Sequence, residues 1–152
     1  MKKIFLIFLL LGSVVLPGCG DYEDEAPRVV MTTPANGASG MINGEAITVT
    51  FNTAMNPLSL KSSTNFNVVE QLTGTPWPFV HNPPDDKTIV FNFVPSADNK
   101  SVSISATAGF LIDGCFLLKV SENVMSSNNI PMDAPYQSCF CTVGEAENTC
   151  GI

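Results

Sequence analysis

The chain has 152 residues, of which 45% are hydrophobic, and this is enough for one domain with a packed core. Seven basic and fourteen acidic residues give a formal net charge of -7, and loss of Lys2 and Lys3 with a cleaved leader leaves five basic against fourteen acidic residues, or -9. A surface of this sign repels phosphate backbones, so the composition argues against a nucleic-acid partner.

Residues 1–18 have the pattern of an export signal. Two lysines precede an apolar run over residues 4–11, which is too short for a comfortable transmembrane helix. The segment ends in Leu16-Pro17-Gly18-Cys19, which resembles the lipobox of bacterial lipoproteins. This resemblance implies cleavage before Cys19 and its modification with acyl chains such as palmitate, which would anchor the protein in a membrane. Under the sorting rule of enteric bacteria, Gly20 favours the outer membrane. The alternative is an ordinary signal peptide followed by a chance cysteine.

Residues 19–26 connect the lipidated cysteine to the domain. This stretch contains four carboxylates and has no apolar periodicity, so we interpret it as an acidic, flexible tether. Metal binding by the carboxylates is the alternative. The sequence therefore predicts a signal peptide at 1–18, the anchor and tether at 19–26, a β-sandwich at 27–143 and a tail at 144–152.

Short segments of alternating polarity fill the chain after the tether. The clearest spans residues 45–51, in which Ile47, Val49 and Phe51 point one way and Thr48 and Thr50 the other, as in a half-buried strand. In a first strand at 28–32, Val29 and either Val30 or Met31 should face the core. Further strands are predicted at residues 65–70, 77–80, 87–94, 101–107, 115–121 and 137–143. Seven to nine short strands at this spacing predict an all-β sandwich of antiparallel strands.

Two connections have signals of their own. Residues 34–40 are rich in Gly, Pro, Asn and Ser, and they are predicted to form a turn region. Asn56 is predicted to cap a short helical turn that starts at Pro57. This turn is expected to direct Leu58 and Leu60 toward the core.

Several motifs follow one another in the first half of the domain: Pro27-Arg28-Val29-Val30, Thr33-Pro34-Ala35-Asn36-Gly37-Ala38, Ile47-Thr48-Val49-Thr50-Phe51 and Ala54-Met55-Asn56-Pro57. Together they resemble the bacterial Ig-like domain described from S-layer proteins. The resemblance implies an Ig-like sandwich in a secreted or cell-surface protein. It also implies a spacer, stalk or adhesion role without catalytic residues. Phe116 stands where the family usually has a tyrosine, and Ser126 stands where it usually has an aspartate.

Apart from Cys19, the chain has four cysteines, Cys115, Cys139, Cys141 and Cys150. An even number in an exported chain predicts two disulfides. If residues 115–121 and 137–143 are antiparallel neighbours, Cys115 lies opposite Cys141, which leaves Cys139–Cys150 to hold the tail. The alternatives are free thiols or a metal site formed by these cysteines with His81, although the spacing is not a recognised zinc pattern.

Three other candidates come from the middle of the chain. His81 is the only histidine, and without a Gly-x-Ser-x-Gly elbow it is best interpreted as a loop residue. Asp85 and Asp86 could form an acid pair for glycoside hydrolysis, but the side chains of adjacent residues point apart, so a turn is favoured. Trp77 and Phe79, flanked by prolines, are predicted to lie on an edge strand and could form a platform for a sugar or peptide.

The sequence thus predicts a non-catalytic, lipid-anchored envelope protein with no cofactor and no metal. Its expected partners are the membrane, through Cys19, and an extracellular or envelope protein or glycan. One alternative is a carbohydrate- or peptide-binding lipoprotein that uses the Trp77 edge. The other is a small metal-binding protein that uses the C-terminal cysteines.

Overall fold

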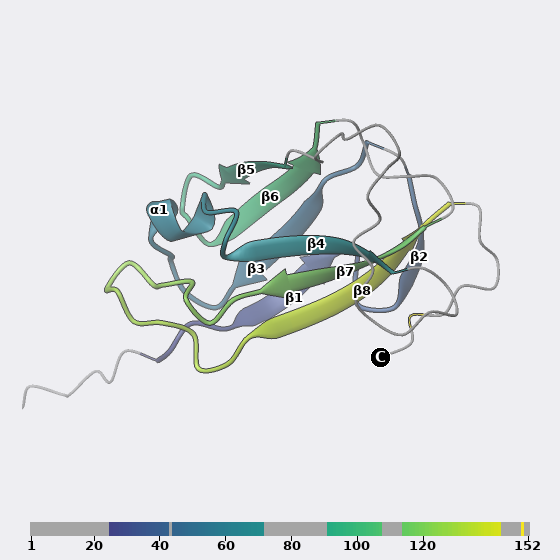
Figure 1. Cartoon of the computed structure of the whole chain (residues 1–152). Helices are drawn as coiled ribbons and strands as arrows, with labels where there is room; N and C mark the ends of the chain where they lie inside the picture. Colours follow the sequence, from purple (N-terminus) through teal and green to yellow (C-terminus); the bar gives the residue numbers. More distant parts are fainter. Residues whose placement is uncertain (1–24, 43, 72–90, 108–113, 144–149, 151–152) are drawn as a thin grey trace, which may run out of the picture.

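The computed structural model describes residues 25–42, 44–71, 91–107, 114–143 and Cys150. These residues form two sheets of four strands, in the orders β1-β3-β6-β5 and β2-β8-β7-β4, which face each other in Figure 1. The predicted all-β sandwich is therefore confirmed. The elements are β1 (Val29–Thr33), β2 (Ala38–Met41), β3 (Ile47–Phe51), α1 (Pro57–Leu60), β4 (Phe66–Gln71), β5 (Phe91–Pro95), β6 (Ser101–Ala106), β7 (Cys115–Val120) and β8 (Tyr136–Thr142).

The core lies between the inner faces of the two sheets. In β3 the alternation seen in the sequence becomes alternation of burial, and Ile47, Val49 and Phe51 are all buried. From the opposite sheet, Phe116 and Phe140 pack with ring centroids 5.6 Å apart. Alternation of this kind requires one buried face on each strand, which is what a two-layer sandwich provides.

Strand β1 departs from simple alternation. Val29 packs against the core, but Val30 and Met31 are 53% and 56% exposed, so the prediction that one of them faces inward was wrong. The register with β3 shifts between Val29 and Met31. An extra residue in one strand moves the following side chains to the other face, and the next buried position is Thr32.

Helix α1 begins as predicted, with the Asn56 side chain accepting a hydrogen bond from the Leu58 amide (3.0 Å) and Pro57 in the first turn. Leu60 is fully buried, but Leu58 is 79% exposed, so its predicted inward orientation was wrong. Residues two apart in a helix lie about 200° apart around the axis and cannot share one face.

Part of the predicted turn region at 34–40 is strand β2, which pairs with β8 in parallel, so the strands are not all antiparallel. The pairing starts where the Gly37 amide donates to the Cys139 carbonyl oxygen (2.7 Å) and the Cys139 amide donates to Asn36 Oδ1 (2.9 Å). Gly37 has a φ of 78°, a conformation that favours glycine. This tight crossing carries the chain from one sheet to the edge of the other.

A hairpin joins β5 to β6, with β6 as a central strand of its sheet. The Ser96 hydroxyl donates to Asp98 Oδ1 (2.6 Å), and the Lys100 amide donates to the same oxygen (3.1 Å). Chiefly through the Ser96 hydroxyl, these bonds lower the pKa of the Asp98 carboxyl because they favour its charged form.

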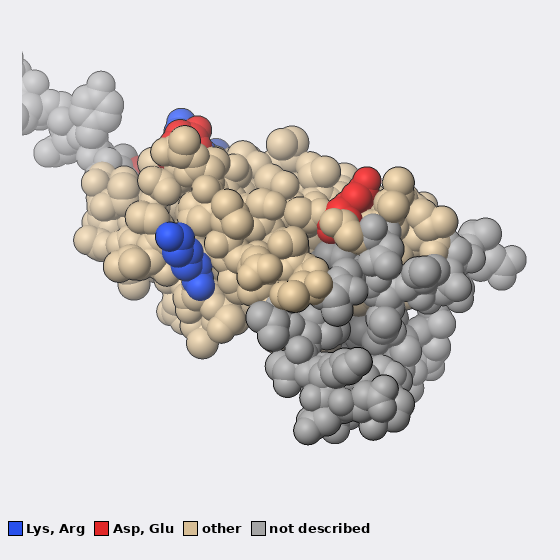
Figure 2. Space-filling model, turned by 90° about the horizontal axis from the view of Figure 1, so that it is seen from above, with Lys and Arg blue, Asp and Glu red and all other residues tan. Residues whose placement is uncertain are grey.

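The outer face is polar over β3 and β6 without being highly charged. On the β3–β6 face the register places hydroxyl side chains beside one another, such as Thr48 beside Ser103 and Thr50 beside Ser101. Few charged side chains are visible on the described surface in Figure 2. None of the described helices is long and apolar enough to cross a membrane.

Candidate functional site

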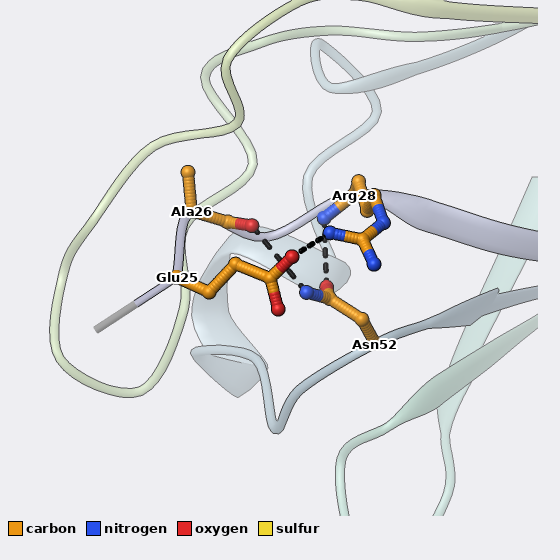
Figure 3. A network of polar contacts seen from close by, with 4 residues as sticks. All are labelled: Glu25, Ala26, Arg28 and Asn52. Carbon is orange, nitrogen blue, oxygen red and sulfur yellow. Dashed lines mark hydrogen bonds and ion pairs between the residues drawn. The ribbon is translucent and has the colours of Figure 1, made fainter. Parts of the chain in front are cut away.

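The chain enters β1 at one end of the sandwich, which we call a pole. There Asn52 holds the residues that precede β1, as Figure 3 shows. The Arg28 amide donates to Asn52 Oδ1 (2.8 Å), and the Asn52 amide donates back to the Arg28 carbonyl oxygen (3.1 Å). Asn52 Nδ2 donates to the Ala26 carbonyl oxygen (3.4 Å), and Arg28 forms an ion pair with Glu25. The end of the predicted tether is therefore fixed to the domain, while Cys19 lies outside the described residues.

Two disulfides lie on the sheet that contains β7 and β8. One joins Cys115 of β7 to Cys141 of β8, which are register partners with Cα atoms 4.0 Å apart. The other joins Cys139 to Cys150, with Cα atoms 5.8 Å apart. These are the two pairs expected from the sequence, and they leave the alternative zinc site without thiolate ligands.

The cysteines and Leu117 occupy the outer face of this sheet, yet they are buried. The exposed fraction is 2% for Cys115, 7% for Leu117, 0% for Cys139 and 1% for Cys141. The inner face of the same strands contributes Phe116 and Leu118 to the core. The disulfide end of the sheet is thus covered on both faces and offers little surface to a ligand.

The outer face is exposed to solvent at the next row of outward-facing residues along the strands. There Asn67 of β4 pairs with Lys119 of β7, and Lys119 pairs with Gln137 of β8. Because directly opposite residues in antiparallel strands have Cβ atoms about 5 Å apart, the three polar side chains form one row across the sheet. Asn67 and Gln137 are exposed, and Lys119 is half-buried.

A hollow of about 200 Å³ is associated with this row, and we call it the Lys119 groove. Its lining includes Asn65, Asn67, Lys119, Ser121, Tyr136 and Gln137. Tyr136 pairs with the buried Val120 and packs against the core, so its side chain lies on the opposite face of the sheet from Lys119 and Gln137. The Ser121 amide donates to the Asn65 carbonyl oxygen (2.8 Å), which extends the β4–β7 pairing to the end of the groove.

No motif in the sequence marks this groove. The candidates that the sequence does offer are Trp77, Phe79, His81 and the acid pair Asp85-Asp86, all of which lie outside the described residues. Polar residues at alternate positions of predicted strands are common on solvated faces and do not indicate a ligand by themselves. Nevertheless, the antiparallel pairing that places Cys115 opposite Cys141 also places Lys119 opposite Gln137.

Within the residues that the structure describes, no three His, Cys, Asp or Glu side chains come together as a group that could hold a metal ion.

The buried polar position Ser126 has a structural role. Its hydroxyl accepts a hydrogen bond from the Ile130 amide (3.1 Å), and its own amide donates to the Ile130 carbonyl oxygen (2.8 Å). Ser126 therefore closes a turn at the position where an aspartate is usual.

Solved structures share this fold at low sequence identity. The S-layer protein rSbsC(31-844) is 12% identical with a TM-score of 0.51, and the match covers 76% of this chain and 13% of that chain. The N-terminal part of the bacterial S-layer protein SbsC is 12% identical with a TM-score of 0.50, covering 76% and 23%. PcoC, a methionine-rich copper resistance protein from Escherichia coli, is 17% identical with a TM-score of 0.48, covering 76% and 96%. The two S-layer structures, with TM-scores of 0.51 and 0.50, indicate a shared fold, and identities this low indicate nothing about ligands.

No curated protein matches the sequence. The family profile described as the bacterial Ig-like domain matches residues 23–142, which is most of the chain. The two facing sheets, the short capped helix and the β7–β8 pairing all lie within this match. The chain belongs to the bacterial Ig-like domain family.

Proposed function

We propose that this protein is a non-catalytic, lipid-anchored component of the bacterial cell envelope, in which the Ig-like domain acts as a spacer or adhesion module. The observation that carries this proposal is the pair of disulfides, Cys115–Cys141 and Cys139–Cys150. Disulfides persist in oxidising compartments such as the periplasm and the cell surface, and they are rare in the cytosol. The compartment is the one that the leader predicts.

The N-terminal approach is consistent with an anchor close to the domain. Cys19 lies six residues before Glu25, so a fully extended connection spans at most about 22 Å. Asn52 holds the chain at Ala26 and Arg28, immediately after this connection. A lipid on Cys19 would therefore keep this pole of the sandwich near the membrane surface.

Lipidation is tested by expressing the full chain in bacteria with an alkyne analogue of palmitate. The chain should incorporate the label and sediment with membranes, whereas Cys19→Ser should abolish both. Cys150→Ala is the matched control, because it removes a cysteine of the domain and leaves the lipobox intact. Labelling that persists in Cys19→Ser, or that is absent from the unmodified chain, would refute the anchor.

The orientation in the envelope is tested with an impermeant protease on intact cells. Degradation of the domain would indicate that it faces outward, as an adhesion module requires. Protection until the outer membrane is opened would indicate a periplasmic role, and crosslinking would then be used to find an envelope partner.

The use of Trp77 and Phe79 for binding a glycan or peptide remains a prediction. If Trp77 is the binding residue, Trp77→Ala should abolish retention of the protein on a cell-wall matrix. Unchanged retention would exclude this edge as the binding surface.

A further inference from the structure

We propose that the Lys119 groove binds one neutral sugar unit of a glycan chain. The functional groups in the row across β4, β7 and β8 match those of a sugar. The side-chain amides of Asn67 and Gln137 each offer donors and an acceptor, and the Lys119 ammonium offers three donors. A sugar hydroxyl both donates and accepts, so adjacent hydroxyls on a ring match alternating amide and ammonium groups.

The size of the groove limits the ligand. Pockets for drug-sized molecules measure roughly 300–1,000 Å³, whereas this hollow measures about 200 Å³. One sugar ring is of the appropriate size, with the rest of a glycan extending into solvent. The exposed Pro135 supplies an apolar part of the lining, against which the carbon-bearing face of a sugar can pack.

The overall charge of the protein favours a neutral sugar over an acidic one. Lys119 is the one cation among the residues that line the groove. The adjoining loop carries the exposed acids Glu122 and Asp133. The Met132 amide, one residue before Asp133, donates to the Glu122 carbonyl oxygen (3.1 Å), so the two acidic residues are close along the backbone of this loop. With a net charge of -7 on the whole chain, a carboxylate ligand would be repelled at long range.

The groove is built on rigid elements. The pairing of β4 with β7 is continuous over six residue pairs, as is the pairing of β7 with β8. Asn65 Nδ2 donates to the Ser59 carbonyl oxygen (2.9 Å), which ties the end of the groove to the residues of α1. A site that is formed before the ligand arrives loses little conformational entropy on binding.

The test uses the full chain purified in a detergent without a sugar head group, so that the detergent does not compete. Cellotetraose, xylotetraose, mannotetraose and chitotetraose are titrated by calorimetry, with tetragalacturonic acid as the acidic comparison. A single ring in a small site should bind with a Kd of about 0.1–1 mM. We expect at least one neutral tetramer to bind and the acidic tetramer to bind more weakly.

Two variants locate the binding. Lys119→Met keeps the aliphatic stem and removes the charge, and Gln137→Ala removes an exposed amide. Each should raise the Kd about tenfold, the effect of losing one or two hydrogen bonds. Lys61→Met, at the exposed end of α1, is the matched control and should change it less than about twofold. Melting temperatures of all variants verify the fold.

The proposal is overturned if no neutral tetramer binds, or if tetragalacturonic acid binds more tightly than every neutral one. It is also overturned if either groove variant binds as the unmodified chain does. Since the site lies within the sandwich, none of these outcomes depends on the lipid at Cys19.

Discussion

The Cys115–Cys141 disulfide should stabilise the domain more than Cys139–Cys150, and the two contributions can be separated. In the chain-entropy description, a cross-link stabilises by restricting the unfolded chain, and the effect grows with the logarithm of the enclosed loop. The sequence separations are 26 residues for Cys115–Cys141 and 11 for Cys139–Cys150. These give about 3.5 and about 2.8 kcal/mol at 25 °C.

The assay uses two alanine variants of residues 19–152 carrying Cys19→Ser, so that no lipid interferes. Cys139→Ala/Cys150→Ala retains the longer-range disulfide, and Cys115→Ala/Cys141→Ala retains the shorter one. Urea unfolding of each variant is measured with and without reductant. The difference between the two conditions isolates one cross-link, because the cavities left by alanine are present in both.

Reduction should lower the free energy of unfolding by about 3.5 kcal/mol in the first variant and about 2.8 kcal/mol in the second. The urea m-value should rise in both, since a reduced chain exposes more surface when unfolded. A loss below about 1 kcal/mol for the longer loop would refute the reasoning. So would a larger loss for Cys139–Cys150, because the entropy of loop closure would then not determine which disulfide stabilises more.

Further substitutions test packing, polar contacts and charge. Leu60→Ala should lower the free energy of unfolding by about 2–5 kcal/mol, and Leu58→Ala, at an exposed side chain, by less than about 0.5 kcal/mol; equal losses in urea would contradict the assignment of α1. Ser138→Ala should cost about 1–2 kcal/mol, because it deprives the buried Thr32 hydroxyl of its partner 3.3 Å away across the core. Adding Thr32→Val should recover part of this loss, and purely additive effects in the double-mutant cycle would exclude coupling. The Ser96 hydroxyl at the β5–β6 turn lowers the pKa of the Asp98 carboxyl. Ionised Asp98 therefore stabilises the folded state above the unfolded pKa, and this stabilisation is lost as the pH falls through the lower folded pKa. An NMR titration should give a midpoint below the ordinary aspartate value.

The sequence predicts an element well when local pattern and tertiary burial agree. Strand β3 is a central strand of its sheet, with one face on the core and the other partly exposed, so its apolar and polar residues alternate cleanly. The Asn56 cap is likewise local chemistry between a side chain and an amide two residues away. The prediction that Leu58 points inward was wrong because residues two apart share a face in a strand but not in a helical turn.

Strand β2 and the irregularity in β1 could not be predicted in this way. Ala38–Met41 has a composition with weak β-propensity, and it becomes a strand through parallel pairing with β8, which is distant in sequence. The register shift after Val29 likewise belongs to the pairing of β1 with β3. Both features arise from contacts between segments, which hydrophobic periodicity does not encode.

The groove lies between these two cases. The expected cysteine pairing implies the register of β7 against β8, and with it the juxtaposition of Lys119 and Gln137. Asn67 joins the row only through the β4–β7 register, for which the chain carries no covalent marker. The residues could therefore be predicted to be surface residues, but their assembly into one row needed the structure.

The two sheets differ in covalent reinforcement, and this bears on how the domain would respond to tension. The sheet that receives the N-terminal tether, β1-β3-β6-β5, contains no cysteine, whereas β7 and β8 of the other sheet are cross-linked. A pull on the tether would act first on the Asn52 contacts and on β1, an edge strand whose hydrogen bonds can open locally. The sheet bearing the Lys119 groove would stay closed while β1 peeled away. If the proposed anchor and the proposed glycan site are both in use, the domain would lengthen under load at its membrane side without releasing the glycan.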